Sequence, residues 1–191
     1  MLRNRAAGRL ILTFFCAFGA WMIVYGALSQ GRDVRPSAVT RAEGLAAWEQ
    51  VYSVLIHPRC INCHTATDYP QQGDKRQRHF ANVVRGPEGK GVPGGHNWHL
   101  APLSMKWQDQ SDKPLSSAAV CRAVTDRTKN HNLDGQGLLK HHAEEALVHW
   151  AWQPGRRPDG TMRALPPLTH EQFVAATRRW VEAGTPCPPV R

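Results

Sequence analysis

The 191-residue sequence contains no internal repeat and no low-complexity block, which argues against repeat and fibrous architectures. Acidic residues are few, since 15 aspartates and glutamates stand against 24 lysines and arginines, for a net charge of +9. Only five cysteines occur, and only one Cys-x-x-Cys pair. A structural zinc site would need a second Cys/His pair, and a thioredoxin-like dithiol would need a strand-helix-strand context, so neither interpretation has support.

The single Cys-x-x-Cys pair is followed directly by histidine, in the sequence CINCH at residues 60–64. This spacing is typical of covalent haem c attachment. Two thiols one helical turn apart can add to the two vinyl groups of a haem, and the adjacent histidine then lies under the iron. We therefore expect one covalent haem c, with Cys60 and Cys63 in the thioethers and His64 as the first axial iron ligand.

The N-terminus has the pattern of an export signal or anchor. A basic end at residues 1–9 precedes an uncharged, mostly apolar run at 10–28. As a helix this run would extend roughly 28 Å, about the thickness of the hydrocarbon core of a bilayer. We expect residues 10–29 to be a transmembrane anchor that leaves the rest on the periplasmic side of a bacterial inner membrane. The alternative is a cleaved signal and a soluble periplasmic protein.

The exported part is expected to be one mostly α domain with long loops, covering residues 40–191 after a linker at 30–39. Capping-box patterns at Thr40 and Thr169 precede helical spacing, which predicts a helix at 41–56 and a C-terminal helix. Shorter helices are predicted near 117–126 and 136–150. The stretches 69–114 and 153–167 are rich in glycine and proline and are predicted loops, which a haem could organise by offering apolar surface.

Two cysteines remain outside the anchor and the haem motif, namely Cys121 and Cys187. In an oxidising compartment they could form a disulfide. Closing so long a loop would stabilise the fold by roughly 4 kcal/mol in the chain-entropy model.

The second axial ligand of the iron decides whether a haem protein carries electrons or binds small molecules. Met105 is the first candidate because it lies in an apolar and aromatic stretch of the long loop, whereas Met162 lies among polar residues. His79 is the main alternative, with His96 and His99 as further rivals. The remaining histidines of interest, His141, His142 and His149, lie on a polar helix, where solvation is expected.

Several separated blocks resemble one family. These blocks are HPRCINCH, QQGD, HFANVVRGPEGKG, WHLAPLSMKW, LVHWAWQPG and TPCP, spread over roughly residues 50–188. They resemble the small exported c-type cytochromes labelled isoquinoline 1-oxidoreductase subunits. The resemblance implies a cytochrome c-like haem-wrapping fold, haem attachment at Cys60, Cys63 and His64, and an association with molybdenum hydroxylases. Many relatives have a second Cys-x-x-Cys-His motif before the WHLAP-like block, and this chain has none, so one haem is expected.

The function expected from these features is single-electron transfer between a redox enzyme, with a molybdenum hydroxylase as one candidate, and an acceptor. Such a protein is a non-catalytic carrier rather than an enzyme, and nucleic acid is not an expected partner. Basic residues at Lys75, Arg76 and Arg78 would form a docking face for redox partners. The alternatives are a haem-based sensor or small peroxidase-like catalyst with an open iron position, and a structural subunit of a larger membrane complex.

Overall fold

Four longer helices contain most of the helical residues that the structure describes. A computed structural model describes residues 38–79, 83–84 and 101–190. Its longer helices are α2 (Arg41–Leu55), α4 (Ser117–Thr125), α5 (Gly135–Glu144) and α7 (His170–Glu182), and its short ones are α3 (Pro58–Ile61), η2 (Leu103–Met105) and α6 (Ala146–Trp150). The only paired strands among these residues are β1 (Gln71–Gln72) and β2 (Gln77–Arg78), which are antiparallel. The prediction of a mostly α domain is confirmed.

The described residues belong to one compact unit, Ala38–Arg191. No helix in the described ranges is long and apolar enough to cross a membrane. The predicted anchor at 10–29 lies outside those ranges, as do the basic end at 1–9 and most of the linker.

Both predicted capping boxes are present. The Thr40 hydroxyl accepts from the backbone N–H of Glu43, and the Glu43 carboxylate accepts from the backbone N–H of Thr40 at 2.8 Å. Thr169 and Gln172 form the same reciprocal pair at the start of α7. These local contacts satisfy N–H groups that a helix start leaves unpaired, and they explain why both helices begin where the sequence predicted.

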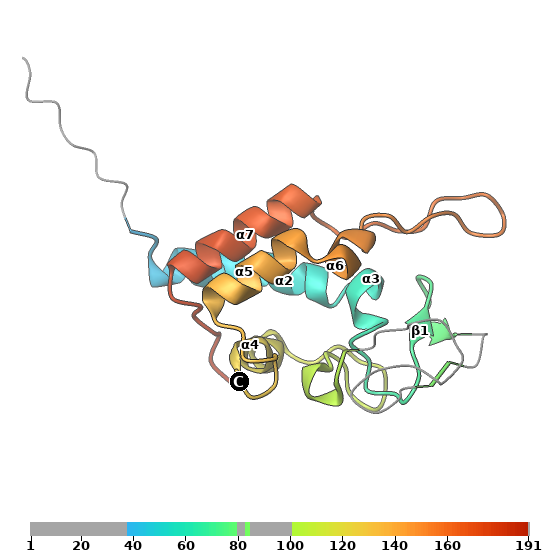
Figure 1. Ribbon diagram of the computed structural model, residues 1–191, viewed down its shortest axis with the longest axis horizontal. Helices are drawn as coiled ribbons and strands as arrows, with labels where there is room; N and C mark the ends of the chain where they lie inside the picture. Colours follow the sequence, from blue (N-terminus) through green and yellow to red (C-terminus); the bar gives the residue numbers. More distant parts are fainter. Residues whose placement is uncertain (1–37, 80–82, 85–100, 191) are drawn as a thin grey trace, which may run out of the picture. The chain divides into compact units, whose positions relative to one another are not determined.

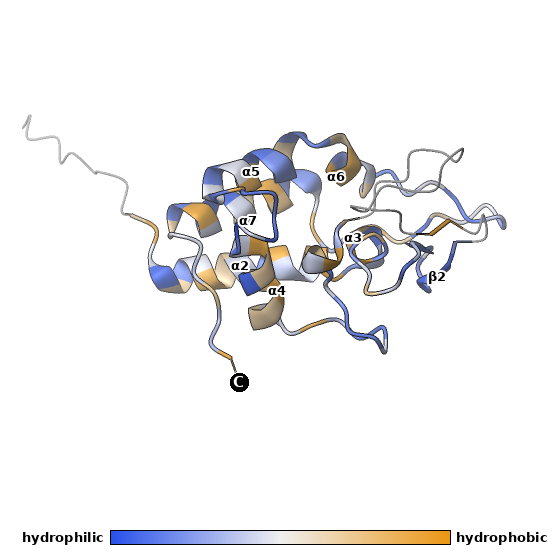
Figure 2. Cartoon of the chain, turned by 60° about the horizontal axis from the view of Figure 1, so that its bottom comes forward, coloured by the Kyte–Doolittle hydropathy of each residue, from blue (hydrophilic) through white to orange (hydrophobic). Residues whose placement is uncertain are grey.

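The predicted helix at 136–150 is in fact two helices, so that prediction was wrong in one respect. Glu145 separates α5 from α6 because its backbone is extended, with φ −70° and ψ 125°. Neither glycine nor proline marks this break in the sequence. The break redirects the chain, and α6 lies at the same end of the helices as α3 in both Figure 1 and Figure 2.

The core lies between α2 and α7. Trp48 of α2 and Trp180 of α7 are fully buried, with ring centroids 4.8 Å apart. Along α5 and α7 in Figure 2, hydrophobic and hydrophilic residues alternate, as expected for helices that bury one face. Gly44 allows α2 to approach the end of α7 closely, because a Cβ atom at this position would lie 2.3 Å from the Cβ of Ala183, just beyond α7.

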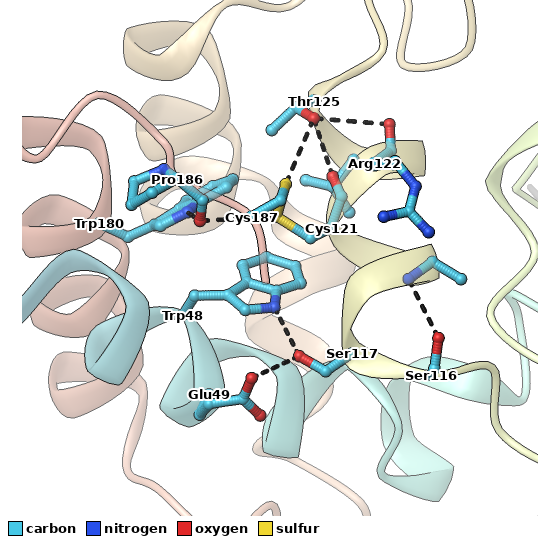
Figure 3. The surroundings of a disulfide bond; sticks show 12 residues. Trp48, Glu49, Ser116, Ser117, Cys121, Arg122, Thr125, Trp180, Pro186 and Cys187 are labelled. Carbon is cyan, nitrogen blue, oxygen red and sulfur yellow. Dashed lines mark hydrogen bonds between the residues drawn. A yellow bond between two sulfur atoms is a disulfide. The ribbon is translucent and has the colours of Figure 1, made fainter. Parts of the chain in front are cut away.

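The predicted disulfide is confirmed. Cys121 of α4 is bonded to Cys187, with the two Cα atoms 5.6 Å apart, inside the usual range. Figure 3 shows the surroundings of the bridge, where the indole N–H of Trp180 donates to Pro186 O at 3.0 Å. The indole N–H of Trp48 donates to Ser117 Oγ at 2.8 Å on the same side of α4. The bridge therefore ties the segment after α7 to α4 beside the tryptophan pair.

Part of the predicted long loop is held by buried polar contacts. The amide of Gln108, which is fully buried, donates to Thr65 Oγ1 at 2.7 Å and to Asp112 Oδ1 at 2.9 Å. Arg76 donates to Gln108 Oε1 at 2.8 Å, and Gln71 donates to Asp112 at 2.7 Å. This network joins the residues after the CINCH motif to the β1–β2 hairpin and to the segment after η2.

Candidate functional site

The CINCH motif occupies a helical turn. His57 caps the start of α3, where its side chain accepts a hydrogen bond from a backbone N–H. The backbone N–H groups of Cys63 and His64 both donate to Cys60 O at 3.1 Å. The turn therefore continues past the end of α3 and includes all three motif residues. This is the local geometry that attachment of a haem through two thioethers requires.

The two motif cysteines are not bonded to each other or to another cysteine. Burial raises the pKa of the Cys60 thiol to about 12, and the neighbouring Cys63 contributes in the same direction. A thiol with so high a pKa is almost entirely protonated at neutral pH, whereas redox and catalytic cysteines have lowered pKa values. This environment argues against a thioredoxin-like dithiol and agrees with cysteines that are modified during maturation.

The His64 imidazole is fixed on two sides. Its Nδ1 atom lies 2.7 Å from Met105 O, and a carbonyl can only accept, so Nδ1 carries the proton. The lone pair is therefore on Nε2, which is the nitrogen that a metal would take. The ring also stacks on Trp107, with centroids 3.4 Å apart and planes 4° from parallel. The backbone N–H of Trp107 donates to His64 O at 2.8 Å, which holds the two residues in register.

Two buried donors close to the motif have no hydrogen-bond partner among the described residues, namely Trp107 Nε1 and Arg59 Nε. Arg59 lies next to Cys60 in the chain, and Trp107 stacks on His64. A buried donor without a partner costs about 1–3 kcal/mol, so such atoms mark places where a ligand acceptor is expected. The carboxylates of a haem are acceptors of this kind. The residues around the motif therefore fit a haem in both the iron ligand and the donors.

Asp74 connects the motif to the loop before α7. Arg59 Nη2 lies 3.2 Å from Asp74 Oδ1, and the Arg157 guanidinium pairs with the other carboxylate oxygen. Burial raises the pKa of Asp74, but the hydrogen bond and charge of Arg157, with the charge of Arg59, together hold that pKa below its usual value. The carboxylate therefore stays ionised and links α3 to residues more than eighty positions away.

The candidates for the second axial ligand lie in different places. Met105 is buried, and its carbonyl is the group that contacts His64 Nδ1. His79 follows β2 and is partly buried, and its backbone N–H donates to Pro70 O at 3.2 Å. Met162 is 53% exposed in the loop between α6 and α7. His96 and His99 lie outside the described residues.

One histidine that the sequence analysis expected to be solvated is buried. His142 on α5 is only 6% exposed, and it lies among aromatic residues, with its ring centroid 4.6 Å from that of Phe173. His141, the preceding residue, is exposed as expected. The sequence could have predicted this burial, because the apolar Leu138 and His142 are four positions apart and therefore share one face of a helix. The expectation for His142 was wrong because the helix was judged by its polar residues as a whole.

The expected basic docking face also needs a correction. Lys75 and Arg78 are exposed, but Arg76 is drawn into the polar network, where it donates to Gln108 and to Asp112 O. Arg78 lies over the Tyr69 ring, 4.5 Å from its centroid. Two of the three cations therefore remain at the surface.

Comparison with protein-family models, with curated proteins and with solved structures found no match for this chain. Within the described ranges, no group of three or more His, Cys, Asp or Glu side chains could hold a metal ion. A haem iron does not need such a group, because the macrocycle supplies four ligands and the protein supplies one or two.

Proposed function

We propose that this chain is a membrane-tethered, periplasmic c-type cytochrome with one haem, which transfers single electrons between a redox enzyme and an acceptor. The observation that carries the proposal is the helical turn that presents Cys60, Cys63 and His64 together, with His64 Nδ1 hydrogen-bonded to a backbone carbonyl. That hydrogen bond orients the ring and puts the lone pair on Nε2, the nitrogen that would bind the iron. The bound haem would supply reversible storage of one electron.

The chain's own residues would hold the haem in three ways. Cys60 and Cys63 would form the covalent bonds, and His64 would bind the iron. Trp107 Nε1 and Arg59 Nε would donate to the haem carboxylates, since both donors are buried and without a partner in the described part of the chain. Trp107 would also restrict the rotation of the His64 ring by stacking on it.

The resemblance in sequence supports a molybdenum hydroxylase as one candidate electron donor. The exposed cations Lys75 and Arg78 lie at the β1–β2 hairpin, which Figure 1 shows beyond α3, and would favour an acidic partner surface.

The test is expression of the full chain together with a cytochrome c maturation system. We expect a mass increase of one haem that survives acid extraction and denaturing electrophoresis. In Cys60→Ala or Cys63→Ala, at most one thioether should form. As a control, Cys121→Ala combined with Cys187→Ala should still acquire covalent haem. Wild-type chain that emerges from a functional maturation system without haem would refute the proposal.

A further inference from the structure

The side chain of His142 is held in a defined tautomer. Its Nδ1 lies 3.0 Å from Thr177 Oγ1, and the Thr177 hydroxyl itself donates to Phe173 O at 3.0 Å. A hydroxyl has one proton, so once that proton is used Thr177 accepts from His142 and Nδ1 carries the hydrogen. The Nε2 atom therefore holds the lone pair. No hydrogen bond in the described part of the chain involves this nitrogen.

This arrangement matches that of His64. Both imidazoles have Nδ1 fixed by an oxygen acceptor, so both direct an unprotonated Nε2 away from that acceptor. Fixing the ring by a hydrogen bond at the second nitrogen is typical of histidines that bind a metal.

His142 also lies in the neighbourhood of the motif. Its ring packs inside the protein, and burial lowers the pKa of His142 to about 3. Phe173, which packs against the His142 ring, belongs to the apolar cluster against which Cys60 packs. The same cluster contains Met105 and Trp107, which both contact His64.

Met105 is poorly placed for the role of second ligand. Its carbonyl accepts from Nδ1, on the side of the His64 ring away from the iron. With a metal–nitrogen bond of about 2 Å, the sixth-ligand position lies roughly 9 Å from that carbonyl oxygen. Within one methionine, the carbonyl oxygen and Sδ are at most about 6 Å apart, from ordinary bond lengths. Met105 cannot keep the hydrogen bond to His64 and also reach the far side of the iron.

We infer that His142 Nε2 is the second axial ligand of the haem iron, opposite His64, with Thr177 as the residue that positions it. The inference rests on the proposed function. It specifies a six-coordinate, low-spin iron with two histidine ligands and without an open position. The reduction potential should be lower than with histidine and methionine, because a methionine ligand raises the potential. A gas sensor or peroxidase-like catalyst, which needs an open position, is then disfavoured.

The experiment uses the full chain matured with haem in three forms: wild type, His142→Ala and the matched control His141→Ala. His141 is the neighbouring histidine on the same helix and is exposed. We expect wild type and His141→Ala to be low-spin, to lack the weak red absorbance of an iron–methionine bond, and not to bind carbon monoxide. His142→Ala should become high-spin, bind carbon monoxide, and return to low-spin on addition of imidazole.

A second variant covers the case in which His142→Ala does not fold. His142→Met should place a thioether at the same position, so the red absorbance should appear and the potential should rise. The inference is overturned if wild type already shows the iron–methionine absorbance, if wild type is high-spin, or if His142→Ala and His142→Met both keep the wild-type spectrum. Absence of covalent haem from wild type is a different outcome, because it refutes the proposed function itself.

Discussion

Removal of the disulfide should cost a large part of the stability of the domain. The bridge joins Cys121, which is fully buried in α4, to Cys187, which lies beyond α7. Immediately before Cys187, Pro186 O accepts from the indole of Trp180 in the core. The bridge therefore holds a C-terminal segment against the tryptophan pair as well as closing a long loop (Figure 3).

The magnitude follows from the length of that loop. The two cysteines are separated by 66 positions. The chain-entropy model gives a stabilisation of about 4 kcal/mol for a loop of this size. Domains of this kind have unfolding free energies of about 5–15 kcal/mol, so the loss is a large fraction of the total. Replacing the buried Cys121 and the half-buried Cys187 with alanine removes two sulfur atoms and adds a smaller packing penalty.

Urea unfolding followed by tryptophan fluorescence measures this loss directly. The buried rings of Trp48 and Trp180 become exposed on unfolding, so the signal reports the core. We expect the double alanine variant to lose about 4 kcal/mol of unfolding free energy. Wild type treated with a thiol reductant should lose a comparable amount. A loss below about 1 kcal/mol would refute the entropic argument, and free thiols at both positions in oxidised, folded protein would contradict the bridge itself.

Three further predictions concern packing, charge and the N-terminus. Gly44→Ala should lower the unfolding free energy by about 1–3 kcal/mol in urea titrations, because the new methyl group would collide with Ala183, which follows α7. As a control, Ala46→Gly at an exposed position of the same helix should lower it by only about 1 kcal/mol. Asp74→Asn should flatten the acid side of a plot of stability against pH. The pKa of Asp74 in the folded protein is below its ordinary value of about 3.9, so the carboxylate stabilises the fold above that pH. This stabilisation is lost as the pH falls through the lower folded-state pKa. Equal acid sensitivity of variant and wild type would contradict the prediction. The mature protein should fractionate with membranes and retain residues 10–28 in mass spectrometry, whereas an N-terminus at or near Gln30 would show a cleaved signal.

Features set by neighbouring residues were predicted well from the sequence. The helix starts at Thr40 and Thr169 depend on side chains three positions away, so a short stretch of sequence contains the whole interaction. The spacing of Cys60, Cys63 and His64 is likewise local, and the motif does lie on a helical turn. By contrast, the break at Glu145 leaves no mark in composition. The residue types around Glu145 do not forbid a continuous helix, so helix propensity could not locate the break.

The choice of a second iron ligand needed contacts between distant parts of the chain. The hydrogen bond that fixes His142 is accepted by Thr177, which is 35 positions away and on another helix. The contact between His64 and residue 105 spans 41 positions and uses a backbone carbonyl, which every residue type possesses. Side-chain identity alone favoured Met105, and only these contacts led us to infer His142 instead.

The hydrogen bond from His64 to the backbone at residue 105 also explains how a loop poor in regular structure can serve a precise site. Met105 ends the short helix η2, and Trp107, two residues later, both stacks on His64 and donates its backbone N–H to His64 O. Next in the chain, Gln108 anchors the segment in the buried polar network beside Thr65. Three residues within the stretch 105–108 thus hold the His64 side of the motif through contacts made by the protein alone. In the proposed haem-bound protein, the conformational adjustment that binding requires should therefore fall on the opposite side of the iron, where we infer that His142 of α5 binds.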